Sequence, residues 1–107
     1  MSKEDRYIVP GLVRGLRVLE ILGEAGEGYS MSELAELLGI NRSSVFRIVH
    51  TLEESGYIRK VGESNHYTLD AKVMDLGFNY LSSLDLISAA RPFLLELRDA
   101  VQIACHL

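Results

Sequence analysis

Four side chains able to contact DNA recur at helical spacing near the middle of this 107-residue chain. Ser43, Phe46, Arg47 and His50 lie at positions i, i+3, i+4 and i+7, which places them on one face of a helix. A hydroxyl, an aromatic ring, a forked cation and an imidazole can together contact base edges and phosphates in a DNA groove. The spacing therefore predicts a recognition helix, which we place at about residues 42–55.

The opposite face of the same segment is apolar. Val45, Ile48, Val49 and Leu52 repeat the same spacing, which is typical of a helix face that packs against a core. At 3.6 residues per turn the two rows point in roughly opposite directions. Asn41 stands just before the helix and is a favourable N-cap residue. Burial of the apolar row is expected to hold the polar row outward.

Two further helices are expected before the recognition helix. Ser30 and Glu33 have the spacing of a capping box, so a helix should open at Ser30 and end at Gly39, a favourable left-handed C-cap. An earlier helix is expected at residues 12–24, after a turn at Pro10-Gly11. The apolar face expected for that earlier helix consists of Leu12, Leu16, Leu19, Ile21 and Leu22.

A β-hairpin should follow the recognition helix. Residues 57–61 and 66–69 have strand-like composition on either side of a turn at 62–65, so we place a wing at 57–69. The fold class predicted is mostly α with a small β-hairpin, arranged as a winged helix-turn-helix followed by helices.

Helical patterns continue beyond the hairpin, over Ala71–Ser82 and Leu86–Val101, with Pro92 kinking the second helix or marking its first turns. The first of these helices has apolar residues on more than one face, which favours a second subunit as an additional partner. Ile103–Leu107 resembles the beginning of a strand.

Together these segments resemble the N-terminal part of IclR-type bacterial transcription regulators. The matching stretches are residues 13–22, 31–58 and 66–77, and residues 84–100 resemble the family's linker into a ligand-binding domain. The resemblance implies a sequence-specific repressor or activator that binds an operator in double-stranded DNA as a homodimer or higher homo-oligomer. A small-molecule effector is implied only if a C-terminal domain exists beyond Leu107.

With this resemblance, the chain divides into three parts. Residues 1–9 are expected to be a flexible N-terminal arm. Residues 10–70 are expected to be the winged helix-turn-helix DNA-binding domain. Residues 71–107 are expected to contain the linker helices that the resemblance implies. They are also expected to contain the start of an effector domain, the rest of which is missing.

Arg47 is the strongest candidate for a base contact, because its forked donors match O6 and N7 of guanine. Phe46 could meet a thymine methyl or a deoxyribose, or it could pack against the wing. Ser30 could offer its free backbone amide and hydroxyl to a phosphate in addition to capping a helix, and Ser44 could be only a cap partner. The candidate DNA-binding residues are Ser30, Arg42, Ser43, Ser44, Phe46, Arg47, His50 and Thr51 and, in the wing, Arg59, Lys60, Ser64, Asn65 and His66.

Composition leaves a second interpretation open. The net charge is −4, whereas a nucleic-acid binder usually presents a basic surface. Residues 41–60 carry four basic and two acidic side chains, a local charge of +2. Salt screens charges more than about 8 Å apart, so the local sign matters more than the total. The alternative is a winged-helix protein–protein interaction module that does not bind DNA.

Other function classes find little support in the residues. No nucleophile motif or phosphate-cradling glycine loop occurs, so we expect no catalytic residues, no enzyme activity and no cofactor. His50, His66 and His106 lack the spacing of a zinc site, so no metal is expected. A single cysteine, Cys105, fits a reducing compartment. Without a membrane span or a signal-peptide pattern, a cytoplasmic location is expected.

Overall fold

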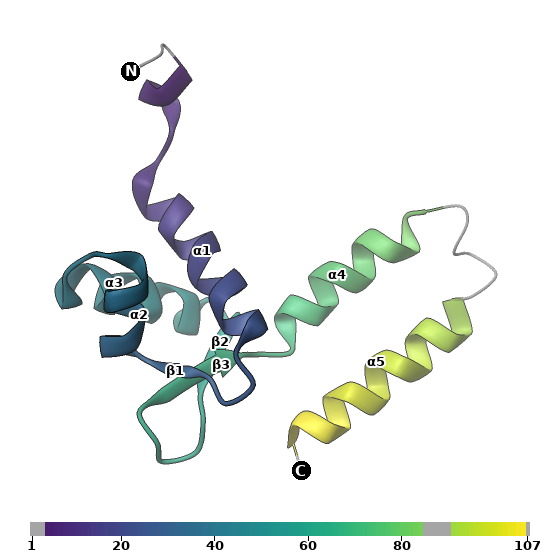
Figure 1. The fold of residues 1–107 in the computed structure, drawn as a ribbon. Coiled ribbons are helices and arrows are strands. Elements are labelled where there is room, and N and C mark those ends of the chain that lie inside the picture. Colours follow the sequence, from purple (N-terminus) through teal and green to yellow (C-terminus); the bar gives the residue numbers. More distant parts are fainter. Residues whose placement is uncertain (1–3, 85–90, 107) are drawn as a thin grey trace. The chain divides into compact units, whose positions relative to one another are not determined.

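A computed structural model describes residues 4–84 and 91–106, with side chains described up to residue 103. The chain forms two compact units, Met1–Leu69 and Asp70–Leu107. Figure 1 shows the elements of the first unit, a 3-10 turn followed by three helices and three strands. Their bounds are Glu4–Tyr7 for the 3-10 turn, Pro10–Glu24 for α1, Tyr29–Ser30 for β1, Met31–Leu38 for α2, Arg42–Glu54 for α3, Ile58–Lys60 for β2 and His66–Leu69 for β3.

The helix ends follow the capping signals in the sequence. Asn41 Oδ1 accepts a hydrogen bond from the backbone N–H of Ser44 at 2.8 Å, which sets the start of α3. Gly39 has a φ of 69°, the left-handed conformation expected after α2. Gly56 has a φ of 87° and closes α3 in the same way. The predicted positions of α2, α3 and their caps are therefore confirmed to within a residue or two.

The wing is part of a three-stranded antiparallel sheet with the order β1-β3-β2. The hairpin partners β2 and β3 lie where the sequence predicts them, with Arg59 opposite Thr68 and Lys60 opposite Tyr67. The strand β1 was not expected; it covers the free edge of β3 with Tyr29 opposite Tyr67 and Ser30 opposite His66. It ties the wing directly to the residue that opens α2.

The approach of β1 to β3 requires a glycine just before β1. Gly28 is buried and has a φ of 80°, a conformation that L side chains rarely adopt. A Cβ atom at this position would collide with the backbone carbonyl of Tyr67. The glycine therefore permits the third strand to pair.

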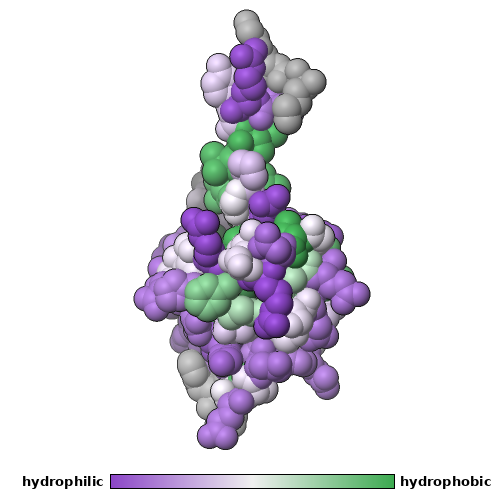
Figure 2. All heavy atoms as spheres, turned by 90° about the vertical axis from the view of Figure 1, so that its left-hand side faces the viewer, coloured by the Kyte–Doolittle hydropathy of each residue, from purple (hydrophilic) through white to green (hydrophobic). Residues whose placement is uncertain are grey.

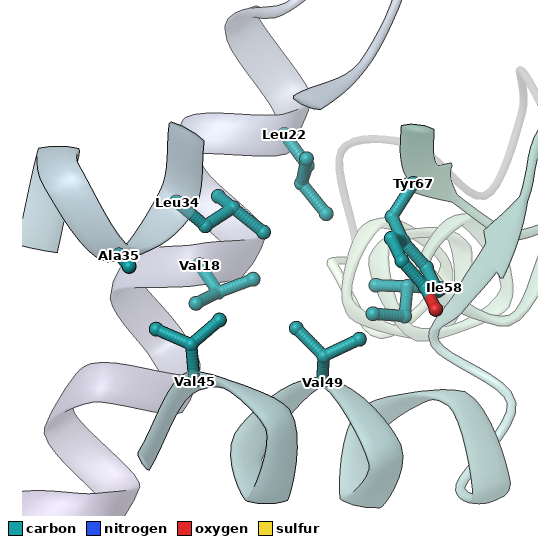
Figure 3. Close-up of a cluster of buried hydrophobic side chains, with 8 residues drawn as sticks. All are labelled: Val18, Leu22, Leu34, Ala35, Val45, Val49, Ile58 and Tyr67. Carbon is teal, nitrogen blue, oxygen red and sulfur yellow. The ribbon is translucent and has the colours of Figure 1, made fainter. Parts of the chain in front are cut away.

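One hydrophobic cluster holds the first unit together (Figure 3). Side chains from α1, α2 and α3 point toward one another and toward two residues of the sheet. Ile48 and Leu52 of the predicted apolar row are partly buried at the edge of this cluster. The buried members are Val18, Leu22, Leu34, Ala35, Val45, Val49, Ile58 and Tyr67.

The core face of α1 agrees with the prediction only in part, since Leu22 of the predicted face is buried. The helix begins at Pro10, its first helical residue, so the expected turn at Pro10-Gly11 is wrong. Gly15, Val18 and Leu22 face the core, whereas Leu12 and Leu16 are 62% and 53% exposed. Leu19 and Ile21 pack only at the edge of the cluster. The helix thus has two adjacent apolar rows. The row of Gly15, Val18 and Leu22 is buried, although the row of Leu12 and Leu16 has the larger side chains.

Two smaller differences occur in the first unit. The sequence pattern of α2 places Leu37 on the apolar side with Leu34, Ala35 and Leu38, but Leu37 is 55% exposed. Residues Glu4–Tyr7 form a 3-10 turn within the segment expected to be a loose arm.

The second unit consists of α4 (Lys72–Ser82) and α5 (Arg91–His106), which pack against each other. Asp75 of α4 lies 3.9 Å from the guanidinium of Arg98 and 3.5 Å from the side-chain amide of Gln102. The Arg98 guanidinium also stands 4.7 Å from the centre of the buried Phe78 ring. These contacts connect the two helices within the unit.

The C-terminal prediction is partly wrong. Ile103 to His106 continue α5 and do not begin a strand, and Leu107 lies outside the described residues. The expected start of this helix at Leu86 also falls outside them. Pro92 is the second residue of α5, where its missing N–H interrupts no helical hydrogen bond. Among the described helices, none is both long enough and apolar enough to cross a membrane.

Candidate nucleic-acid interface

The polar row of α3 lies on the surface of the first unit. Ser43, Arg47 and His50 are exposed, and Phe46 keeps 54% of its surface accessible. Val45, in the opposite row, is fully buried. Figure 2 faces the side of the molecule that carries α2 and α3, and its surface there is mainly hydrophilic. The rotation of α3 about its axis is therefore the one that the two rows predict.

Arg47 is available for an external partner. Its side chain is exposed and makes no hydrogen bond or ion pair with any residue in the part of the chain that the structure describes. Its backbone carbonyl accepts a hydrogen bond from the hydroxyl of Thr51 at 2.7 Å. Thr51 thus directs its hydroxyl to its own helix, while the cation of Arg47 extends from the same turn.

A hollow of about 200 Å³ lies where α2, α3 and the wing meet. Its volume exceeds the roughly 30 Å³ that one water molecule occupies in the liquid. Arg42 at the start of α3 and Lys60 in β2 supply two cations to its lining, and none of the described residues that line it carries a carboxylate. The other lining residues are Ser30, Met31, Ser32, Asn65 and Tyr67.

Helix geometry adds to the attraction of this hollow for an anion. Met31 and Ser32 are in the first turn of α2, where backbone N–H groups have no carbonyl partner within the helix. The positive end of the helix dipole also lies there. These two residues were absent from the sequence-based set of contacts. The capping box was the available signal, because the residues just after an N-cap carry such N–H groups.

Ser30 has less freedom than its sequence position suggested. Its backbone N–H donates to Glu33 Oε1 at 2.9 Å, and its hydroxyl accepts from the Glu33 N–H at 3.2 Å. The expectation of a free Ser30 amide is therefore wrong, because the reciprocal capping box uses it. Ser30 lines the hollow, but the residue is almost fully buried and the Glu33 N–H already donates to its hydroxyl.

The wing is held by side-chain contacts at its base. His66 places Nε2 3.6 Å from Glu33 Oε1 and Nδ1 3.4 Å from the carbonyl of Glu27. Hydrogen bonds from Ser30 lower the pKa of the Glu33 carboxyl, and the nearby His66 acts in the same direction. His66 thus links β3 to the start of α2.

The remaining wing candidates divide into occupied and outward-facing side chains. The Ser64 hydroxyl donates to the Val61 carbonyl at 2.6 Å and accepts from the His66 N–H at 3.2 Å, so it closes the turn. Arg59 is half-buried. Lys60 and Asn65 are exposed and line the hollow.

The described residues contain no group of three or more His, Cys, Asp or Glu side chains that could hold a metal ion. Burial raises the pKa of the Tyr67 hydroxyl, and the charge of Glu53 acts in the same direction, so Tyr67 remains neutral at physiological pH. Arg42 and Arg47 of α3 and Lys60 of β2 are exposed basic side chains of this unit.

Residues 11–62 match the family model for the IclR helix-turn-helix domain. Over 97 residues the chain is 35% identical to an uncharacterized HTH-type transcriptional regulator of Haemophilus influenzae, an alignment that covers 91% of this chain and 36% of that protein. It is 32% identical over 91 residues to the transcriptional repressor IclR of Escherichia coli, covering 85% and 33% of the two chains. The chain thus spans about a third of the length of these relatives.

The fold also matches solved structures. The crystal structure of an IclR family transcriptional regulator from Brucella abortus superposes with a TM-score of 0.71 at 35% identity. This match covers 86% of the present chain and 35% of the other. The architecture is therefore a winged helix-turn-helix followed by helices, as the sequence predicted.

The Glu33 contacts generate a prediction about pH and stability. Because the folded state lowers the pKa of this carboxyl, ionised Glu33 stabilises the fold above the ordinary carboxyl pKa of 4.5. That contribution should be lost as the pH falls through the lowered value. Glu33→Gln keeps the capping geometry without the charge. We expect the wild type to exceed Glu33→Gln in free energy of unfolding at pH 7, and we expect this difference to shrink as the pH falls below 4.5, measured by urea denaturation. A difference that stays constant with pH would contradict this assignment.

Proposed function

Since this chain belongs, through residues 11–62, to the IclR family of helix-turn-helix transcription regulators, we propose that it binds operator DNA sequence-specifically as a dimer. The observation that carries the proposal is the outward row of α3, in which Arg47 is exposed while Val45 and Val49 are fully buried. The proposal places α3 in the major groove, with Arg47 donating to O6 and N7 of a guanine. Ser43, one turn earlier, is then within reach of an adjacent base or phosphate.

The backbone contacts come from the hollow and the wing. A DNA phosphate seated between Arg42 and Lys60 is favoured by both cations and by the positive end of α2. Asn65 lines the same hollow and can donate its amide to the phosphate or to a sugar oxygen. These contacts position the protein on the duplex without reading its sequence, whereas the α3 row reads bases.

Dimerisation is supported by apolar surface in the second unit. Leu76 and Tyr80 of α4 are 61% and 65% exposed, and Leu81 is 36% exposed. Such residues are normally covered in a regulator that works as a symmetric pair, so the proposal assigns α4 to the subunit contact. The two copies of α3 then meet half-sites about one helical turn apart, roughly 34 Å.

Repression is the mode we favour, because relatives such as the Escherichia coli protein carry the name of repressors. The chain would act where the DNA lies, in the bacterial cytoplasm.

Selection of bound sequences from a random duplex library tests the proposal as a whole. The 107-residue chain should enrich a motif with two inverted half-sites, and its affinity for that motif should fall steeply with added salt. A protein–protein interaction module would enrich no motif and show no duplex affinity even at low salt. That outcome would exclude the proposed function.

Arg47→Ala should weaken binding to the selected duplex by about 1–3 kcal/mol and relax the preference at one base pair of each half-site. The reason is the loss of two hydrogen bonds to one guanine. Arg17→Ala is the matched control, because Arg17 is an exposed arginine of the same unit whose surface ion pair with Glu20 contributes little. Fluorescence anisotropy on duplexes that vary one base pair measures both effects. Equal losses for the two variants would remove Arg47 from base recognition.

Lys60→Ala should weaken binding to all duplexes alike and reduce the salt dependence of log K by about one phosphate contact. Lys60→Arg retains the positive charge and should keep the wild-type slope. Titrations at several salt concentrations, with selected and with scrambled duplex, measure the slope. If Lys60→Ala kept the full slope, the phosphate would have to be placed elsewhere.

A further inference from the structure

Two aromatic side chains of α3 stack on its outer surface. Phe46 and His50 are one helical turn apart, their ring planes differ by 8° and their centroids are 5.9 Å apart. That separation lies within the range of about 4.5–7 Å over which aromatic pairs attract in an offset arrangement. Both side chains are exposed, so the pair is formed without support from the core.

The stack restricts where Phe46 can point. A lone exposed phenylalanine samples several rotamers, but contact with the ring four residues later favours one of them. Phe46 is also the direct neighbour of Arg47, the proposed guanine contact. An apolar ring is thus held beside the cation that enters the major groove.

The chemistry of this ring selects its target. A phenyl group has no hydrogen-bond donor or acceptor, so it cannot distinguish the polar edges of bases. The one apolar group that a base pair presents in the major groove is the C5-methyl of thymine. A contact with deoxyribose would be the same for all bases and would add no selectivity.

We propose that Phe46, positioned by its stack on His50, selects a thymine in each half-site by contact with the C5-methyl group. This inference rests on the proposed function and names part of its target sequence. Phe46 is the specificity-determining residue, and His50 is a positioning residue that acts through Phe46.

Replacement of thymine by deoxyuridine removes the methyl group and leaves base pairing unchanged. In the selected duplex, we consider the guanine for which the preference is lost in Arg47→Ala. Each thymine near that guanine is replaced in turn, and the affinity of the 107-residue chain is measured. In each half-site, one of these single replacements should weaken wild-type binding by about fourfold, the value expected for the loss of one buried methyl group. For Phe46→Ala the same replacement should have no effect.

Variants of His50 separate positioning from direct contact. His50→Ala removes the stacked ring and should reduce the deoxyuridine penalty, whereas His50→Phe retains a ring and should preserve it. Circular dichroism confirms that each variant folds, which is expected because both positions are on the surface. A general structural role for His50 would change overall affinity without changing the penalty.

The outcomes distinguish this inference from the proposed function. Tight, selective binding with no penalty at any thymine would overturn the thymine contact and leave the proposed function intact. A penalty of equal size in wild type and Phe46→Ala would assign the effect to another side chain or to the DNA, and would also overturn it. If the chain enriches no sequence at low salt, the proposed function itself fails.

Discussion

The packing of α3 against α1 and α2 is the constraint on which the interface depends. Val45 and Val49 are completely buried against a cluster that includes Val18 and Leu34. Because these two valines are four residues apart on one side of α3, their burial sets the rotation of the helix. Every outward side chain of the row, including Arg47, takes its direction from that packing. A rotation of α3 about its axis by one residue, about 100°, would turn Arg47 away from the outward direction that it has now.

The wing depends on a second set of contacts, near the start of α2. The short strand β1 pairs with the central strand β3, and Gly28 allows the two backbones to approach. His66 then connects β3 to Glu33, the same carboxylate that accepts a hydrogen bond from Ser30. One acidic group therefore takes part in both the cap of α2 and the base of the wing. The hollow near the start of α2 is lined by Arg42 and Lys60 from separate elements, even though the whole chain has a net charge of −4.

Features encoded by local chemistry could be predicted from the sequence. The capping box, the Asn41 cap, the two rows of α3 and the hairpin all depend on residues within a few positions of one another. The strand β1 could not be predicted, since two residues carry no periodicity and their pairing depends on β3, far away in sequence. The core face of α1 was misassigned because Gly15 adds no side chain to the buried row, so the exposed Leu12 and Leu16 gave the stronger hydrophobic pattern. The Ser30 amide is not free, because the capping box that the sequence predicts for Ser30 and Glu33 already uses it.

The contacts made within the chain also narrow the set of groups that can read bases. Thr51 and Ser64 use their hydroxyls on nearby carbonyls, and His66 faces Glu27 and Glu33. Arg42 and Lys60 converge on a hollow suited to a phosphate, which carries no sequence information. Under the proposed function, base recognition is then assigned mainly to Ser43, Phe46 and Arg47, which can cover only a few base pairs. A site this short recurs often by chance, so the proposed function requires two half-sites to be read together for selectivity. The small number of side chains in the α3 row that can contact bases therefore supports the proposed dimer.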